Sequence, residues 1–217
     1  MALSKATTVD DMMKSFPTHS IVPVEGRPTY RTLKPIFKSV DKCAESIPSN
    51  QPKGHLYLTT TNTEFHRFTG DWKVIPTKPT PTPTVPPAAT QFVIAQANRD
   101  HDLTVKVYHA HQIASEALKK LITDNIQEIY LDGIDAGSSA PIELIKYLKD
   151  HYYKISSLEL AKNDKALRSD WDVETPIEQY FRTVKVCQEL ADNAQEPYTD
   201  KQIVQIMFIQ MQRIELF

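Results

Sequence analysis

The chain has 217 residues, 41% of them hydrophobic, and a formal net charge of -2 at pH 7. This length suits one large domain or two small ones, and the mixing of both charge signs excludes a strongly basic surface for nucleic acid or membranes. Only five glycines occur against fifteen prolines, which disfavours folds that need many tight turns or phosphate-binding loops. Helices joined at proline-marked corners fit this composition better.

Residues 1–27 are polar and show no sustained apolar period, so we expect a weakly ordered N-terminal segment. This segment has no apolar run typical of a signal peptide, and no stretch of about 18 apolar residues could span a bilayer. The two cysteines, Cys43 and Cys187, are expected to be reduced core residues. The sequence therefore predicts a cytoplasmic protein that does not enter a membrane.

Residues 28–74 are predicted to form a small, mainly helical subdomain. "HLYLTTT", residues 55–61, alternates and is rich in threonine, which predicts a short β element. Thr61 and Glu64 then allow a capping box for a short helix that ends at Gly70. Before them, a helical pattern with Pro35 near its start places these apolar residues on one face: Ile36, Phe37, Val40, Cys43, Ala44 and Ile47.

Residues 75–90, "IPTKPTPTPTVPPAAT", form the low-complexity stretch of the chain. Alternating proline and threonine is incompatible with a helix or a central strand, so we expect an extended, semi-rigid linker or strap. A functional alternative is a docking peptide for a proline-recognising domain. The linker is the simpler interpretation, because a bare repeat is compositional evidence only.

Residues 91–217 are predicted to form a helical domain. Its first pattern runs from about Ala95 to Leu131 and is broken by "DGIDAGSS", residues 132–139. A short helix follows at "PIELIKYLKDHYY", and Ser156 with Glu159 predicts a capping box for the next one. Thr199 with Gln202 caps a last helix that is apolar on most sides, which should lie in a core or an interface.

The stretch "SDWDVETPIEQYF", residues 169–181, marks one helix start most closely. Thr175 is expected to be the N-cap, Pro176 the first helical residue, and Glu178 the partner that closes a capping box. Trp171, just before, is predicted to be a core anchor rather than a ligand platform. The helix that follows carries one apolar stripe: Ile177, Tyr180, Phe181, Val184, Cys187 and Ala191.

Catalytic and metal-binding patterns are weak throughout. "DAG" at Asp135 suggests an aspartic-protease triplet, but helical patterns flank it, so a turn between helices is the preferred interpretation. His109 and His111 are two residues apart, which points them to different faces of a helix and argues against one shared metal. We therefore predict no catalytic residue, no metal ligand and no cofactor, and a protein that is not an enzyme.

The order of these features resembles the amino-terminal capsid region of Gag-like polyproteins from copia-type retrotransposons. The resemblance implies a mainly α, multi-helix bundle like the N-terminal domain of a retrotransposon or retroviral capsid. It also implies a structural protein that self-assembles through protein-protein contacts to package element RNA. The matching pieces are "IYLD" (129–132), "PIELIKYL" (141–148), "YYKISSLEL" (152–160), Asn163, "WD" at Trp171, "TPIEQYF" (175–181) and "ELADNAQEPYTDKQIV" (189–204), with weaker ones at "PTYRTLKPI" (28–36) and "HLYL".

Gag proteins normally continue into a second helical domain and often into a zinc knuckle that binds RNA. Neither occurs before Phe217, so the resemblance implies that RNA is bound by a region absent from this chain. An alternative is a domesticated, Gag-derived host adaptor that binds a protein partner through the Pro/Thr stretch or the N-terminal segment, without catalysis. An enzyme would rest on Asp135 alone.

Overall fold

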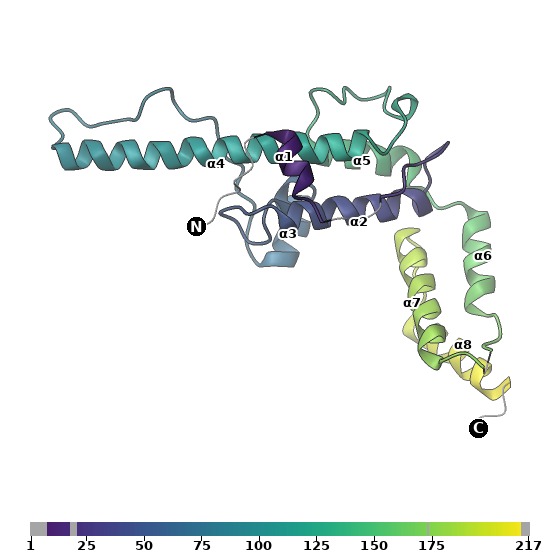
Figure 1. Ribbon diagram of the computed structural model, residues 1–217. Helices are drawn as coiled ribbons and strands as arrows, with labels where there is room; N and C mark the ends of the chain where they lie inside the picture. Colours follow the sequence, from purple (N-terminus) through teal and green to yellow (C-terminus); the bar gives the residue numbers. More distant parts are fainter. Residues whose placement is uncertain (1–7, 18–20, 173, 214–217) are drawn as a thin grey trace. The chain divides into compact units, whose positions relative to one another are not determined.

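The computed structural model describes residues 8–17, 21–172 and 174–213. The chain is mainly helical and divides into two compact units, Met1–Tyr153 and Lys154–Phe217 (Figure 1). No strand occurs within the described ranges, where β-type pairing is limited to a bridge between Val24 and Ile126. Among these residues, none of the helices combines the length and the apolar character that crossing a bilayer requires.

The first unit is organised around its longest helix, α4, against which α1, α2 and α5 pack. Its helices bury one continuous apolar core that extends from Met12 to Leu148. In chain order the elements are α1 (Val9–Lys14), α2 (Tyr30–Ser46), the 3-10 helix η1 (Leu56–Leu58), α3 (Asn62–Thr69), α4 (Gln91–Thr123), the 3-10 helix η2 (Glu128–Tyr130) and α5 (Pro141–Tyr152).

The apolar face predicted for the helix around Pro35 is confirmed in α2. Thr29 caps its first turn, and Pro35 lies within the helix near that end. A proline there removes one backbone N–H donor and so costs one helical hydrogen bond. The burial of a complete apolar face stabilises the helix by more than this cost. The buried face contains all six predicted residues: Ile36, Phe37, Val40, Cys43, Ala44 and Ile47.

The β element predicted at residues 55–61 is wrong, because the segment forms the 3-10 helix η1. All three residues of η1 are buried, whereas a surface strand would expose alternate side chains. The Thr60 hydroxyl donates to the Leu56 carbonyl at 2.9 Å, and the Thr59 hydroxyl, which donates to Asp41 Oδ1 at 2.7 Å, lies 3.2 Å from the same carbonyl. Threonine side chains that bond back to the preceding turn stabilise a tight helical turn instead of a ladder.

The described parts of the N-terminal segment, residues 8–17 and 21–27, are more ordered than predicted. Residues 1–7 and 18–20 lie outside the described residues, but Thr8 caps α1, and Met12 within it is buried. Val24 is buried as well, and its N–H donates to the Asn125 carbonyl at 2.9 Å. Isolated apolar residues in a polar segment give no period, yet each one can dock on a preformed helix surface.

The division of the chain also differs from the predicted one. Residues 28–74 form no separate subdomain, because Leu33 and Phe65 share one core with Leu118 and Leu144. The boundary falls after Tyr153 instead of at the Pro/Thr stretch. Sequence composition marks where a chain is irregular, whereas a domain boundary is where few contacts cross.

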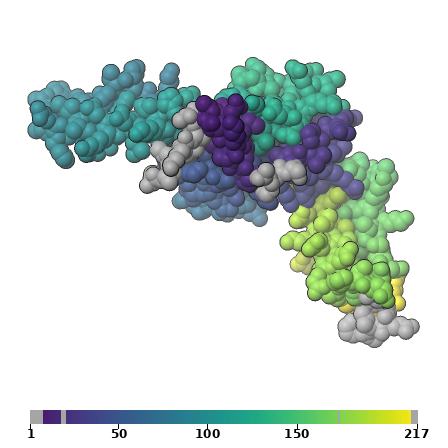
Figure 2. Space-filling model, viewed as in Figure 1, coloured from purple at the N-terminus to yellow at the C-terminus, as the bar shows by residue number. Residues whose placement is uncertain are grey.

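Helix α4 begins and ends earlier than the predicted range of about Ala95 to Leu131. Thr90 caps its start, and after Thr123 the chain turns into η2. Only the second half is buried in the core, through Ala114, Ala117, Leu118 and Ile122. In the first half, Phe92 and Leu103 are exposed, and Figure 2 shows this half as the blue-teal projection of the first unit.

Residues 75–90, the Pro/Thr segment, contain neither helix nor strand, as their composition predicts. The segment runs beside the first half of α4 (Figure 1), and Nε2 of His101 lies 2.8 Å from the Thr80 carbonyl oxygen.

The capping box predicted for the helix before this segment, α3, is confirmed. Glu64 N–H donates to Thr61 Oγ1 at 3.2 Å, and Thr61 N–H donates to Glu64 Oε2 at 2.8 Å.

The second unit is a three-helix arrangement of α6 (Ser157–Leu167), α7 (Ile177–Asn193) and α8 (Asp200–Arg213). Its small core gathers residues from all three helices, and Trp171, Tyr198 and Met207 pack against that core while remaining partly exposed. The buried apolar residues are Leu167, Tyr180, Val184, Cys187, Ile203 and Ile206.

Candidate functional site

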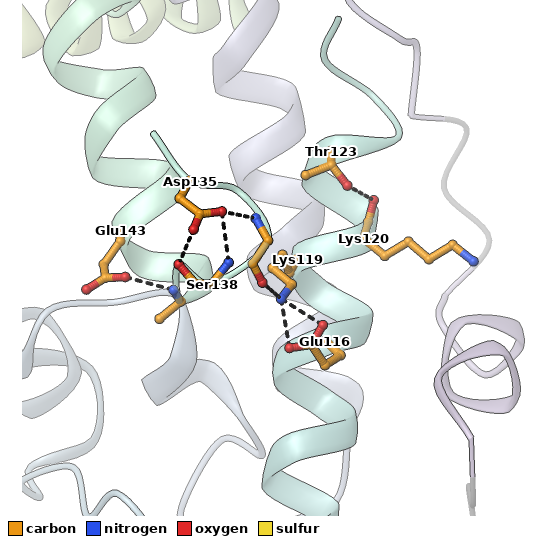
Figure 3. A network of polar contacts seen from close by, with 9 residues as sticks. Glu116, Lys119, Lys120, Thr123, Asp135, Ser138 and Glu143 are labelled. Carbon is orange, nitrogen blue, oxygen red and sulfur yellow. Dashed lines mark hydrogen bonds and ion pairs between the residues drawn. The ribbon is translucent and has the colours of Figure 1, made fainter. Parts of the chain in front are cut away.

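Asp135, the residue that suggested a protease, lies in the turn between η2 and α5 with an exposed side chain. Its Oδ2 accepts the Ser138 hydroxyl at 2.7 Å, and its Oδ1 accepts the Gly137 N–H at 3.0 Å (Figure 3). The hydrogen bond from Ser138 is the main cause that lowers the pKa of the Asp135 carboxyl. An ionised carboxylate committed to its own turn is unsuited to sharing a proton with a second one, as the acid-protease reaction requires.

Helix α4 holds the same turn in place. Lys119 Nζ donates to the Gly137 carbonyl at 2.7 Å and to Glu116 Oε1 at 2.8 Å (Figure 3). On the other side of the turn, Glu143 Oε2 accepts the Ala140 N–H at 2.8 Å, which completes the start of α5. The turn therefore links two packed helices, which agrees with the preferred interpretation of the sequence.

A hollow of about 460 Å³ borders the Asp135 turn, and Asp124, Glu128 and Asp132 also line it. Carboxylates around a hollow can attract a hard cation when several of them converge. No group of three or more His, Cys, Asp or Glu side chains is placed to hold a metal ion in the part of the chain that the structure describes. The hollow is thus an acidic surface feature.

His109 and His111 separate as their spacing predicts. His111 turns toward η1, where its Nδ1 lies 3.0 Å from the Tyr57 hydroxyl and its ring stacks on the Tyr57 ring at a centroid distance of 5.8 Å. Burial lowers the pKa of His111, whereas the His109 side chain is exposed. His111 and Tyr57 thus pack α4 against η1. The spacing of residues in the sequence does not predict this contact, because 54 residues separate the two rings.

The helix start predicted at Trp171, Thr175 and Pro176, which we call the corner of the second unit, is present with different hydrogen bonds from those predicted. Pro176 is the N-cap of α7 in place of Thr175, and the helix begins at Ile177. Thr175 Oγ1 accepts the Trp171 Nε1–H at 3.0 Å and donates to the Asp172 carbonyl at 2.7 Å. The Thr175 side chain is therefore occupied by the corner and does not cap the helix.

The capping box predicted between Thr175 and Glu178 is absent, because the N-cap residue is Pro176, which makes no side-chain cap hydrogen bond. Glu178 lies in the first turn of α7, where a negative charge interacts favourably with the helix dipole. Trp171 is half-buried, with its ring centroid 6.5 Å from that of Tyr180. Trp171 thus anchors the edge of the core, which is a weaker role than the predicted core anchor.

Both remaining predicted caps are present. Ser156 Oγ accepts the Glu159 N–H at 3.2 Å, and Glu159 Oε2 accepts the Ser156 N–H at 3.1 Å before α6. Thr199 Oγ1 accepts the Gln202 N–H at 3.3 Å, and Gln202 Oε1 accepts the Thr199 N–H at 2.8 Å before α8. Reciprocal capping boxes fix both helix starts without tertiary help, which explains why sequence alone located them.

The second unit exposes large apolar side chains from each of its helices. On α8, Ile203 and Ile206 face the core, while Val204 and Phe208 are 64% and 56% exposed. Residues four apart lie on one helix face, so Val204 and Phe208 form an outward stripe. We use the term outward apolar surface for the six large apolar side chains that the described residues of the second unit expose, which are spread over its three helices: Leu158, Phe181, Val186, Val204, Phe208 and Ile209.

Comparison with known proteins adds no relative to this picture: no protein-family model matches, and no curated protein or solved structure matches significantly. The evidence for the candidate site therefore comes from the sequence and structure of this chain alone. The outward apolar surface is the feature that the sequence signalled only in part, through the apolar character of the last helix on most of its sides.

Proposed function

We propose that the chain is a structural protein of the Gag type, which works in the cytoplasm without catalysis and self-assembles through protein-protein contacts. The outward apolar surface of the second unit is the observation that carries this proposal. A unit of about 60 residues has a small core, so apolar area left outside that core adds little to folding and much to association. Covering it with another copy of the chain would remove it from water.

Helix α8 has one face in the core and a second apolar face in solvent, and this arrangement supports an interface with another molecule. The inward residues Ile203, Ile206 and Gln210 recur at spacings of three and four, which is a complete core-facing stripe. Gln210 is buried, and its Nε2 donates to the Arg168 carbonyl at 2.8 Å. The outward pair, Val204 and Phe208, therefore has no place left in the core of its own unit.

Of the pieces that carry the resemblance to copia-type Gag, those after Tyr153 include packing positions of the second unit, whereas "IYLD" and "PIELIKYL" lie in the first unit. Asn163 is buried against α7, the Trp171 corner precedes α7, and Tyr180 lies in the core. This agreement supports a shared architecture for the second unit. Packaging of element RNA is part of the proposal, and we assign RNA binding to a region of the polyprotein outside this chain.

Light scattering and negative-stain microscopy of the purified chain, over a range of concentration and salt, test the proposal. We expect concentration-dependent oligomers, rings or particles that dissociate in the Phe208→Ser and Val204→Ser variants. Gln205→Ser, an exposed polar position on the same helix, is the matched control and should assemble like the parent. A chain that stays monomeric at every concentration, and in the presence of the full polyprotein, would refute the proposal.

The second candidate is a host adaptor of Gag ancestry, and exposure of the Pro/Thr segment favours it. Thr80, Pro81 and Thr82 all face solvent, as a proline-rich ligand of an aromatic-lined groove requires. Binding of one proline-recognising domain that is lost in a Pro81→Ala, Pro83→Ala variant would support an adaptor. Unchanged interactions of the same variant in the native cell would exclude this role for the segment.

A further inference from the structure

The chain contains three Thr-Pro dipeptides, and their surroundings differ. Two lie in the Pro/Thr segment at Thr80 and Thr82, and the third is Thr175 at the start of α7. Thr80 and Thr82 are each flanked by prolines on both sides, as "PTPTP", and both side chains are exposed. The Thr80 hydroxyl makes one bond, as a donor to the Thr82 carbonyl, whereas the partly buried Thr175 hydroxyl both accepts from Trp171 and donates to the Asp172 carbonyl.

Proline on either side prepares a threonine for recognition in an extended conformation. A residue before proline is restricted to the extended region, and the ring fixes the next φ near -65°. The Pro/Thr segment has neither helix nor strand around these residues, so an enzyme can bind it without first unfolding any element. Little conformational entropy is then lost on binding, which favours complex formation.

The charges within the Pro/Thr segment and its neighbours in sequence are positive. Within residues 72–98 the charged side chains are Lys73 and Lys78, so this stretch carries a formal charge of +2. A phosphate group carries a charge of about -1.5 to -2 at pH 7, so one phosphate neutralises the stretch and a second one reverses its sign. On α4, His101 lies 2.8 Å from the Thr80 carbonyl oxygen and is flanked in sequence by Asp100 and Asp102, so the positive charge belongs to the segment and not to the helix beside it.

We propose that Thr80 and Thr82 are acceptor sites for a proline-directed serine/threonine kinase, whereas Thr175 is not. In this reaction the threonine Oγ attacks the terminal phosphorus of a nucleoside triphosphate, and the bond from that phosphorus to the bridging oxygen breaks. The nucleoside diphosphate leaves, and the hydroxyl proton passes to a carboxylate of the kinase. At Thr80 the ester replaces the proton that the hydroxyl donates to the Thr82 carbonyl at 2.7 Å.

The experiment incubates the full chain with a purified proline-directed kinase, MgATP and no other substrate, followed by mass spectrometry of the peptides. Phosphate is expected on Thr80 and Thr82, with at least tenfold less on Thr84, which precedes Val85, and on Thr175. The total phosphate incorporated by a Thr80→Ala, Thr82→Ala double variant should be at least tenfold lower than that of the parent chain. Thr84→Ala is the matched control and should incorporate phosphate like the parent.

Two further variants separate recognition from mere exposure. Pro81→Ala and Pro83→Ala keep both hydroxyls and should lower incorporation at the preceding threonine about tenfold. No incorporation in the parent chain, equal incorporation at Thr84, or incorporation chiefly at Thr175 would each overturn the proposal. Pro81→Ala and Pro83→Ala do not change the outward apolar surface. The amount of phosphate incorporated therefore tests this proposal independently of whether the chain assembles.

Discussion

Asn163 and Cys187 join α6 and α7 by a reciprocal pair of contacts. Asn163 Nδ2 donates to the Cys187 carbonyl at 2.9 Å, and Cys187 Sγ lies 3.7 Å from the Asn163 carbonyl as a weak donor. Asn163 is only 6% exposed. A buried amide is costly unless it is hydrogen-bonded, so this side chain fixes the register in which the two helices meet.

The first prediction concerns this amide. Asn163→Ala removes the donor to the buried Cys187 carbonyl, and we expect the free energy of unfolding of the second unit to fall by about 1–3 kcal/mol. Cys187→Ala is the comparison variant, because it leaves the amide bond intact and removes the weak thiol donor together with one buried sulfur atom, at a cost of about 1 kcal/mol. Urea unfolding followed by circular dichroism measures both. Equal losses in the two variants would show that the amide bond is not what aligns the helices.

The second prediction concerns the corner before α7. Thr175→Val keeps the shape of the side chain but removes the acceptor for Trp171 Nε1 and the donor to the Asp172 carbonyl. We expect a loss of about 1 kcal/mol and a shift in Trp171 emission toward that of solvated indole. Trp171 is half-buried, so Trp171→Ala should cost about 2 kcal/mol, less than the roughly 3–5 kcal/mol of a fully buried ring.

The measurement is made in a Trp72→Phe background, because Trp72 is the other tryptophan of the chain and its side chain is 59% exposed. Thr183→Val is the matched control, since that threonine is partly exposed on α7 and its hydroxyl donates to the Gln179 carbonyl, away from the corner. An emission maximum that is the same in Thr175→Val and in the parent would contradict the assigned hydrogen bond.

Features that depend on neighbours in sequence were predictable, and features that depend on tertiary competition were not. The buried stripe of α2 and the capping boxes at Thr61, Ser156 and Thr199 follow from local spacing. Thr175 has the composition of a cap, but the Trp171 N–H competes for the same oxygen. Trp171 is four residues from Thr175, and whether its N–H reaches the threonine oxygen depends on how the corner folds.

The same distinction explains η1 and the candidate site. The pattern "HLYLTTT" resembles a strand because of its residue types, yet Tyr57 packs against His111, which lies far away in the sequence. Burial of every η1 side chain follows from that distant contact. For α8, composition predicted a core or an interface, and only the structure separates Ile203 and Ile206 inside from Val204 and Phe208 outside.

The third prediction is a loss of stability in weak acid that originates at His55. The ring is buried, burial is the main cause that lowers its pKa from 6.5 to about 4, and its Nδ1 lies 3.3 Å from the Ile47 carbonyl. The unfolded chain therefore binds more protons than the folded chain between these two pH values, so stability falls as pH decreases through that window. The loss is on the order of 3 kcal/mol, and urea unfolding at several pH values measures it.

Neighbouring groups modify this pH dependence. Burial also lowers the pKa of His111, which adds a loss of the same sign. Burial raises the pKa of Asp41, so the folded chain takes up that proton earlier on acidification, and the change opposes the loss. His55→Gln, which cannot titrate, should flatten the curve, whereas His109→Gln at an exposed position should not. A curve of unchanged steepness in His55→Gln would assign the acid sensitivity elsewhere.

The last prediction tests how the end of α2 is enclosed. Gly54 has a φ of +60° and precedes His55, whose N–H donates to the Ala44 carbonyl at 2.8 Å. A Cβ atom at Gly54 would lie against the Ile47 carbonyl oxygen and 2.6 Å from that of Glu45, and backbone atoms cannot yield as a flexible side chain can. Gly54→Ala thus combines left-handed strain with overpacking, and we expect a loss of about 3 kcal/mol or more.

Gly70 is the matched control for this substitution, because it has a similar φ of +80° at the end of α3, but apart from its own chain neighbours nothing lies within 4 Å of the position that an added methyl group would take. Gly70→Ala should therefore cost only the left-handed strain, about 1–2 kcal/mol. Thermal unfolding of both variants separates the two contributions, since their difference measures the contact with the carbonyls at the end of α2. If both variants lose the same stability, Gly54 is needed only for its φ, and the residues after it do not close tightly over α2.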